Sequence, residues 1–456
     1  MENFLGAPRR ALFRLAWPTL MATLVQTMYN LVDTAYIGRL GSAPLAALTF
    51  SFPLFFTLVS FNIGMGVGLN AMVSRSLGAG QERDAANTAL HGIASSLLCA
   101  ALLFLITELF LDPLLTLLGA EAVVHKLAGD YMRIIAAGVF LMFPMYAISS
   151  IFTAQGDTIT PMKIQFFTLF LNLGLDPLFI FTFKLGIKGA AIATDLALLA
   201  GLLMAAFYLK RRSRLQFSRK IWQFSPATIK ELYAIGLPAS LTMLLMAIYM
   251  MGINRLIAGY GTDTVAALGL VTRIDSAVII PMVALSVSLL TLTAFFYGAR
   301  QFHLLAEIIH FAMLVNIAFA LGCALLMFLW PSFFLRCFTN KAEPLRLAAA
   351  YLRLEILSFP FMAITIAANR ALQGLGLSLP GMVINGTRLF VVALPLASLF
   401  VIYLKYDFRL VAIAGLCGNL ASSSLAYFWL KKILAEISTT PPPVNVERNV
   451  ERVRLD

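Results

Sequence analysis

The chain has 456 residues, of which 60% are hydrophobic and only 12% charged, and its formal net charge is +12. Soluble domains carry about 25% charged residues, so this composition excludes an ordinary soluble enzyme or a nucleic-acid-binding domain. The mean hydropathy is +0.87. Apolar runs of about 20 residues match the hydrocarbon core of a bilayer, so the sequence predicts an integral membrane protein.

Twelve apolar segments follow one another along the chain. Each is much longer than the roughly 9–11 residues of a barrel strand. Only helices and closed barrels span lipid, so we predict an all-α integral membrane protein with twelve transmembrane helices. The predicted spans are 12–38, 45–75, 87–111, 128–154, 162–183, 188–209, 231–258, 265–296, 304–330, 347–371, 380–403 and 410–432.

Basic residues gather at three places that an even number of spans puts on one side of the membrane. Positive residues collect on the cytoplasmic side, so both termini are expected there. Specific binding of anionic lipids is the alternative explanation, and no nucleic-acid partner is expected. The residues are Arg9, Arg10 and Arg14 before the first span, Lys210, Arg211, Arg212, Arg214, Arg219, Lys220 and Lys230 in one loop, and Lys431 and Lys432 at the end of the last span.

The apolar segments and the basic loop divide the chain into four parts. Residues 1–209 form an N-terminal six-helix lobe, 210–230 a basic cytoplasmic linker, and 231–437 a C-terminal six-helix lobe. The tail 438–456 contains three consecutive prolines and reads as disordered. The first apolar stretch is too long for a cleavable signal peptide and is expected to be the first span.

The two halves align when the chain is shifted by 220 residues. Six helices return each half to the same side, so the repeats are parallel, and transporters place substrate sites between such halves. Duplication retained only for packing is the alternative. The matching pairs include Pro18 and Pro238, Tyr29 and Tyr249, Gly41 and Gly261, Gly78 and Gly298, and Tyr131 and Tyr351.

Three acids lie inside predicted spans of the first half: Asp33, Asp176 and Asp195. Buried charges in a membrane cost about 2.5–3.5 kcal/mol each on insertion scales, so such residues are functional candidates. Counted along their helices, all three lie roughly 10 Å below the outer surface. Close carboxylates cannot all ionise comfortably, so one is expected to hold a proton. The same oxygens could bind Na⁺ instead, and the remaining alternative is interfacial residues wetted from outside.

Polar neighbours share the helix faces of these acids. Asn172 lies four residues before Asp176, and Thr194 precedes Asp195. Gln26 and Tyr29 share the face of Asp33, and we expect them to line or gate a substrate cavity. Pro18 removes a hydrogen bond inside the first helix, where the resulting kink is either a hinge or a packing feature.

The second half carries a different set of charges. Arg273 and Asp275 lie in the eighth span, Glu355 near the outer end of the tenth, and Arg388 in the eleventh. We interpret them as structural ion pairs. The four cysteines and four histidines are scattered and show no metal-binding or redox spacing, so no metal centre of that kind and no cofactor is expected.

In these features the chain resembles the multidrug and toxic compound extrusion (MATE) family, and its prokaryotic DinF-like branch most closely. The resemblance covers about residues 8–435. It rests on the 6+6 halves and on five segments in order: NLVDTAYIGRLG at 30–41, SRSLGAGQ at 74–81, AQGDTITPM at 154–162, NLGLDPLFIF at 172–181 and GIKGAAIAT at 186–194.

The resemblance implies a V-shaped, two-lobed transporter of a prokaryotic inner membrane, not an enzyme. It implies antiport of small cationic or amphipathic compounds against H⁺ or Na⁺, and a monomer. The branch's ion-coupling positions match Asp33, Asn172, Asp176 and Thr194, which are also the candidate Na⁺ ligands, with Tyr29 one turn before the first acid. The implied mechanism is protonation of Asp33, bending of the first helix near Pro18 and displacement of drug.

The chain departs from other branches of the family. The seventh helix carries no acid, and Phe361 stands where the tenth helix of those branches has one, so the resemblance implies no coupling through the second half. Asp195 is also outside the family pattern and would add an anionic ligand or a second proton site. Three alternatives stay open: a flippase for a lipid-linked precursor, an intramembrane enzyme and a non-transporting scaffold.

Overall fold

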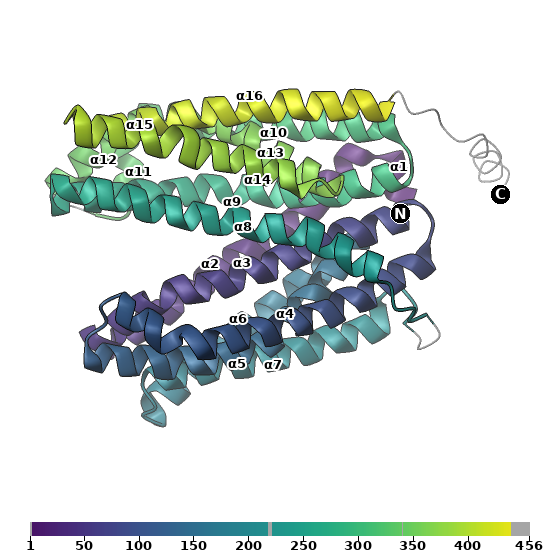
Figure 1. Cartoon of the computed structure of the whole chain (residues 1–456), viewed down its shortest axis with the longest axis horizontal. Helices are drawn as coiled ribbons and strands as arrows, with labels where there is room; N and C mark the ends of the chain where they lie inside the picture. Colours follow the sequence, from purple (N-terminus) through teal and green to yellow (C-terminus); the bar gives the residue numbers. More distant parts are fainter. Residues whose placement is uncertain (1, 218–220, 340, 439–456) are drawn as a thin grey trace.

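The computed structural model describes residues 2–217, 221–339 and 341–438, and these residues form helices joined by short turns, with no strand among them. The predicted tail lies outside the described residues from position 439 on. The helices form two bundles that splay apart like the arms of a V (Figure 1). The predicted all-α, two-lobed architecture is therefore confirmed.

The first bundle, called the N-lobe, spans residues 2–212. A π-helical stretch, η1, continues α6 and widens its last turn. The elements are α1 (Glu2–Gly6), α2 (Pro8–Gly38), α3 (Ser42–Gly78), α4 (Glu82–Leu117), α5 (Ala122–Ala154), α6 (Ile159–Pro177), η1 (Leu178–Thr182) and α7 (Ile187–Arg212).

The second bundle, called the C-lobe, spans residues 226–438 among those described. Two of its spans are broken into shorter helical pieces. The elements are α8 (Pro226–Ile257), η2 (Ala258–Tyr260), α9 (Thr262–Gly298), α10 (Phe302–Leu329), α11 (Pro331–Arg336), α12 (Ala342–Glu355), η3 (Ile356–Ser358), α13 (Phe359–Gly374), α14 (Ser378–Gly386), η4 (Thr387–Ala393), α15 (Leu394–Ser398), η5 (Leu399–Tyr403) and α16 (Leu410–Ser438).

Eleven helices of the described chain are long and apolar enough to cross a membrane. The predicted first span, α2, is not among them, although its 31 residues are long enough for the crossing. Its apolar surface is interrupted by Thr19, Thr23, Gln26 and Asp33. The predicted span that is too polar to be counted among these eleven is therefore one of the three that carry candidate site residues.

The observed helices run beyond the predicted apolar limits. For example, α4 covers Glu82–Leu117, where the sequence predicted 87–111. Polar end turns extend a helix past the hydrocarbon core without changing its apolar centre. The predicted linker 210–230 is shorter in the structure, because α7 runs to Arg212 and α8 begins at Pro226.

The internal duplication is visible in the backbone as well as in the sequence. Left-handed backbone conformations recur 220 or 221 residues apart, at turns that follow equivalent spans. One pair is unequal in residue type, since Gly80 has φ 72° while Arg300 adopts φ 55° without being glycine. The other pairs are Gly41 and Gly261, Gly156 and Gly376, and Lys184 and Lys405.

At one end of the molecule, the first turns of each lobe's leading helix pack into the other lobe. We call this the closed end; it is where α2 and α8 begin and α3 and α9 end. Leu12 and Leu15 of α2 belong to the hydrophobic core of the C-lobe. Their repeat equivalents in α8, Leu232 and Ile235, belong to the core of the N-lobe. Each lobe thus holds the first turns of the other lobe's leading helix.

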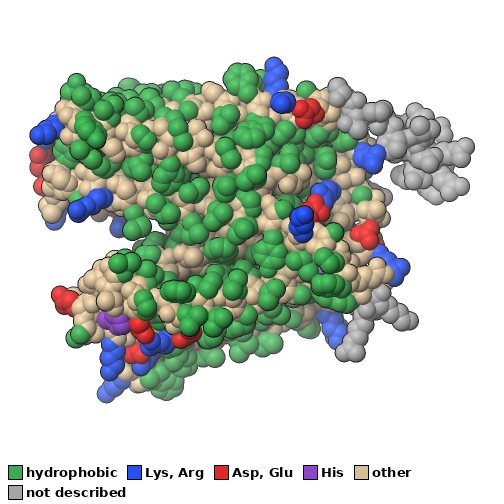
Figure 2. Space-filling model, viewed as in Figure 1, with side chains coloured by type: hydrophobic (Ala, Val, Ile, Leu, Met, Phe, Trp, Pro, Cys, Tyr) green, Lys and Arg blue, Asp and Glu red, His purple; other side chains and the backbone are tan. Residues whose placement is uncertain are grey.

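The opposite, open end shows a hollow between the lobes. Figure 2 shows this hollow as a notch in the space-filling surface. Apolar side chains of the helices around it are exposed, including Leu31 of α2, Phe52 of α3 and Met251 of α8. In the closed half the same helices are packed; for example, a Cβ on Gly64 would lie 2.5 Å from the Gly236 carbonyl oxygen. The molecule is therefore closed at one end and open at the other.

The connection between the lobes is fastened to the N-lobe. Gln155 accepts hydrogen bonds from the Ser213 hydroxyl and the Arg214 backbone N–H. Trp222 stacks on the buried His91 ring with centroids 4.5 Å apart, and the Ser225 N–H donates to the Nε2 atom of His91. These contacts fix the point at which α8 starts on the N-lobe surface.

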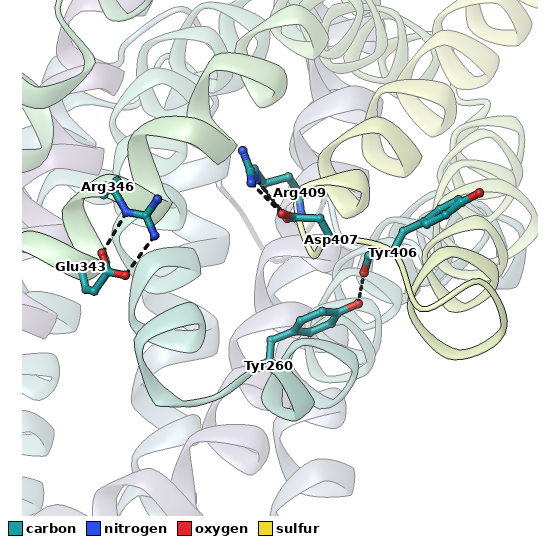
Figure 3. A network of polar contacts seen from close by, with 6 residues as sticks. All are labelled: Tyr260, Glu343, Arg346, Tyr406, Asp407 and Arg409. Atoms are coloured by element: carbon teal, nitrogen blue, oxygen red, sulfur yellow. Dashed lines mark hydrogen bonds and ion pairs between the residues drawn. The ribbon is translucent and has the colours of Figure 1, made fainter.

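Polar contacts also hold the loops of the C-lobe together at the open end (Figure 3). The Tyr260 hydroxyl donates to the backbone carbonyl of Tyr406. In the same loop, Arg409 forms an ion pair with Asp407 at 2.7 Å, and its hydrogen bonds lower the pKa of that carboxyl group. The loop before α16 is thereby tied to η2, so these two connections are expected to move as a unit.

Candidate functional site

The candidate site lies in the open half of the N-lobe, where α2, α6 and α7 pack together. Asp33 and Tyr29 come from α2, Asn172 and Asp176 from α6, and Thr194 from α7. Asp176 is fully buried, Asn172 is 1% exposed and Thr194 is 7% exposed. Five of the predicted residues from three separate spans therefore gather in one cluster, which we call the N-lobe cluster.

Hydrogen bonds join these residues across the helices. The Tyr29 hydroxyl donates to the Thr194 hydroxyl oxygen at 3.0 Å, and Asn172 Nδ2 donates to Asp176 Oδ1 at 3.1 Å. The carboxyl groups of Asp33 and Asp176 lie close enough to interact electrostatically.

Several oxygen atoms of this cluster are buried without a hydrogen-bond partner. They are Asp33 Oδ1, Asn172 Oδ1 and Asp176 Oδ2. Unsatisfied buried acceptors cost free energy, and a proton or a small hard cation satisfies them. Among the described residues, no three His, Cys, Asp or Glu side chains form a group that could hold a metal ion. A set of two carboxylates, one amide and one hydroxyl has the oxygen atoms needed to bind a single positive charge.

Asp195 lies apart from this pair of carboxyl groups. Its Oδ1 atom lies 2.0 Å from the point that a Cβ on Gly138 of α5 would occupy, so the carboxyl group rests on the α5 backbone. Asp195 Oδ1 is also buried without a partner. Tyr131, which is 5% exposed, interacts electrostatically with Asp195 and with both acids of the pair. Of the three acids predicted to cluster, the structure joins two and connects the third through Tyr131.

The two remaining predicted residues occupy different places along α2. Gln26 is exposed and accepts a hydrogen bond from Gln165 of α6. Each of these two glutamines lies more than one helical turn before the acid of its own helix. Pro18 lies inside α2, between the part packed in the C-lobe core and the part that carries the cluster. Neither contacts the acids through a hydrogen bond recorded among the described residues.

Three residues near the cluster were not predicted from the sequence as site residues: Tyr131, Gly138 and Gln165. In the sequence Tyr131 is marked only as a repeat position, because Tyr351 lies 220 residues further on. A buried polar ring repeated in both halves was a usable signal of a cavity wall. No comparable signal existed for Gly138, whose role depends on the packing of α5 against α7.

The second half contains its own polar cluster, but the predicted ion pairs are absent among the described residues. The Arg273 guanidinium lies over the Phe338 ring, 5.9 Å from its centroid, and Asp275 Oδ1 is buried without a partner. Arg388 donates to Asn419 and to a methionine sulfur rather than to a carboxylate. The interpretation as structural ion pairs is therefore wrong at these residues.

The fold and this site define a polytopic helical membrane protein with two parallel repeats. The MatE family profile matches residues 18–178 and again residues 238–399. The chain belongs to the MatE family of membrane transporters. The second match begins 220 residues after the first, as the internal repeat requires.

Relatives and solved structures extend over nearly the whole chain. The "Probable multidrug resistance protein YoeA" of Bacillus subtilis is 27% identical over 399 residues, covering 86% of each chain. The "FAD transporter" of Shewanella oneidensis is 29% identical over 409 residues, covering 87% of this chain and 89% of that one. The structure of a MOP superfamily transporter from Pyrococcus furiosus superposes with a TM-score of 0.89 at 26% identity, covering 95% and 97%.

Proposed function

We propose that this protein is a secondary active exporter of small organic molecules, driven by antiport against H⁺ or Na⁺. The observation that carries the proposal is the N-lobe cluster, in which two interacting carboxyl groups and an amide present buried oxygens without partners. The chain belongs to a transporter family, and several of its relatives are named as multidrug resistance proteins; both facts support export as the direction of transport.

The ion acts through α2 in the proposed mechanism. One half of this helix carries Tyr29 and Asp33, and the other half places Leu12 and Leu15 in the C-lobe core. Binding of H⁺ or Na⁺ neutralises the carboxyl pair and changes how α2 packs against α6. Because the same helix contributes to the closed-end contact, that change is transmitted to the interface between the lobes.

Pro18 lies between these two halves, about 22 Å from Asp33 at the helix rise of 1.5 Å per residue. Proline cannot donate the backbone hydrogen bond expected at this position, so α2 is more easily bent there than elsewhere. The proposed role of Pro18 is therefore a hinge that allows the cluster half of α2 to move while the closed-end half stays packed.

The distribution of basic residues supports an orientation with the closed end at the cytoplasm. Arg9, Arg10 and Arg14 begin α2 at that end, and Lys210 to Arg212 end α7 there. The positive-inside rule therefore supports the proposal that the hollow opens at the outer face of a prokaryotic inner membrane, with both termini cytoplasmic. In this conformation a bound molecule would be released outward.

The proposed cargo is a small cationic or amphipathic molecule, carried by a monomer embedded in lipid. Carboxylates of the N-lobe would attract a cation, and the exposed apolar residues of the hollow would bind its hydrocarbon parts. One relative of similar length is named as an FAD transporter, and that name extends the candidate cargo beyond drugs. No cofactor is required by this mechanism.

Reconstituted vesicles test the coupling ion directly. An inward-directed Na⁺ gradient is imposed at clamped pH, and a proton gradient is imposed separately without Na⁺, while export of a fluorescent cation such as ethidium is followed. One of the two gradients is expected to drive transport. If neither gradient changes the rate of export in vesicles that contain folded protein, ion-coupled antiport is rejected.

A further inference from the structure

A pocket of about 370 Å³ opens between loops of the C-lobe at the open end of the molecule. Residues of α12, of η2 and α9, and of the connection between η5 and α16 line it. Two of the lining residues, Thr264 and Phe408, are each 5% exposed, so part of the wall is firmly packed. The pocket lies in the other lobe from the N-lobe cluster and takes no part in the proposed antiport.

Positive charge exceeds negative charge in this pocket. Arg346, Lys405 and Arg409 line it together with a single acid, Asp407. Glu343 pairs with Arg346 from outside the lining residues, so the group keeps an excess of one positive charge. Lys405 is exposed and has no ion pair among the described residues. An anion is therefore the ligand that the charges of the pocket attract.

Each arginine of the pocket is held by its own acid on one edge only (Figure 3). Arg346 donates from Nε and Nη2 to Glu343 at 2.9 and 3.0 Å. Arg409 donates from Nε and Nη2 to Asp407 at 3.0 and 2.7 Å. A guanidinium group has five N–H donors in a rigid fork, and neither Nη1 atom has an acceptor among the described residues. The acids therefore orient both guanidinium groups and leave donors for a further anion.

The N-lobe fills the equivalent place with an acid of its own. Lys188 and Asp130 are the repeat equivalents of Arg409 and Ala350, 221 and 220 residues earlier. Lys188 Nζ forms an ion pair with Asp130 Oδ2 at 3.0 Å. Ala350 lines the pocket and has no carboxylate, so the C-lobe lacks an anion where the N-lobe supplies one. Cations stand at all three positions in both lobes, as the pairs Lys126 and Arg346, Lys184 and Lys405, and Lys188 and Arg409.

We propose that this pocket binds the phosphate group of an anionic phospholipid or of a soluble phosphate ester. The unused donors of Arg346 and Arg409, together with the Lys405 ammonium group, form charge-assisted hydrogen bonds to the phosphate oxygens. The phosphate takes the place that the Asp130 carboxylate has in the N-lobe. If the ligand is a lipid, its acyl chains extend over Leu404, which directly precedes Lys405 and is 45% exposed.

Thermal unfolding of the full chain in a nonionic detergent tests the proposal, because a ligand that binds the folded state raises the melting temperature. Dioctanoylphosphatidylglycerol supplies the phosphate on a lipid, and glycerol 1-phosphate supplies it without acyl chains. Dioctanoylphosphatidylcholine is the control, since the cations of the pocket repel its ammonium group. A rise with phosphatidylglycerol alone identifies a lipid site, and an equal rise with glycerol 1-phosphate identifies a site for soluble esters. No rise with either compound, or an equal rise with phosphatidylcholine, overturns the proposal.

Two substitutions connect the binding to this pocket. Lys405→Gln is expected to weaken it about ten-fold, in the range for hydrogen bonds to charged groups. Lys184→Gln is the matched control and should leave the affinity unchanged, because Lys184 has φ 57° at the equivalent N-lobe turn, against 50° for Lys405. Ala350→Asp introduces the acid of the N-lobe while keeping all three cations, so it should abolish the ligand-induced rise. The melting transition without ligand reports folding, and unchanged affinity in either folded variant overturns the proposal.

Discussion

Gly78 of α3 and Gly298 of α9 press against each other's helices at repeat-equivalent positions. A Cβ on Gly78 would lie 2.0 Å from the Phe295 carbonyl oxygen, and a Cβ on Gly298 would lie 1.9 Å from the Arg75 carbonyl oxygen. Phe295 and Arg75 are themselves 220 residues apart. The closed end is thus a nearly two-fold contact in which only glycine permits the backbones to approach.

Gly298→Ala is expected to disfavour the closed end, because the added methyl group overlaps a backbone carbonyl. Overpacking of this kind costs about 1–3 kcal/mol, which corresponds to a shift of roughly 5- to 150-fold in the balance of conformations. Spin labels at positions 45 and 265 of the open end report the change. Their distance distribution should gain a shorter component.

Gly322→Ala is the control for that substitution, since nothing lies within 4 Å of a Cβ at Gly322. The control should reproduce the wild-type distribution. An unchanged distribution in Gly298→Ala would show that the close approach of α3 and α9 does not hold the lobes in this conformation.

The ion pair between Arg75 and Glu231 provides a second, weaker contact at the closed end. Their side chains are 30% and 41% exposed, so the pair is worth no more than about 1 kcal/mol. Arg75→Gln should therefore shift the same label distances less than Gly298→Ala does. Exchanging the charges in the double variant Arg75→Glu, Glu231→Arg should restore part of the shift, and a double variant worse than both single ones would contradict this account.

Tyr29→Phe removes one hydroxyl from the N-lobe cluster and leaves the Thr194 oxygen without its donor. The ion concentration that gives half-maximal export should rise by roughly 2- to 10-fold, as expected for a net hydrogen bond of about 0.5–1.5 kcal/mol. Thr194→Val should have a similar effect. If the two residues act through their shared bond, the double variant should be little worse than either single one; full additivity would show that they act separately.

Asp195→Asn is expected to slow gradient-driven export only a few-fold, because its carboxyl group rests on α5 and not against Asp33 or Asp176. Gly138→Ala should imitate that effect by displacing the Asp195 carboxyl group. Gly129→Ala, where a Cβ meets nothing closer than 3.7 Å, is the control in the same helix. Complete loss of export in Asp195→Asn would show that Asp195 is as essential for coupling as Asp33 and Asp176.

Hydrophobic runs and the 220-residue repeat predicted most of the fold, because span length and residue order are properties of the chain itself. The same patterns predicted that Asp33 and Asp176 lie near each other. They could not show that Asp195 turns toward Gly138, since the rotation of α7 depends on packing against α5. Depth along a helix was readable from the sequence, whereas the direction of the side chain was not.

Charges in the C-lobe were misread for a related reason. Arg273 and Asp275 are two residues apart, so on a helix they point in different directions and cannot pair along it. Arg388 and Glu355 come from different spans, and only the tertiary packing shows that Arg388 meets Asn419 and Met246. Residues of opposite charge in neighbouring spans do not by themselves predict an ion pair.

The carboxyl pair of the N-lobe is proposed to couple an ion gradient to export. Asp33→Asn tests it most directly, because the amide keeps the size of the side chain and removes its negative charge. Export of ethidium from vesicles should be measured under the gradient that drives the wild type, with Asp195→Asn measured alongside. Asp33→Asn protein is expected to fold and to bind substrate, but no longer to respond to the gradient. A wild-type rate of gradient-driven export in Asp33→Asn would contradict it.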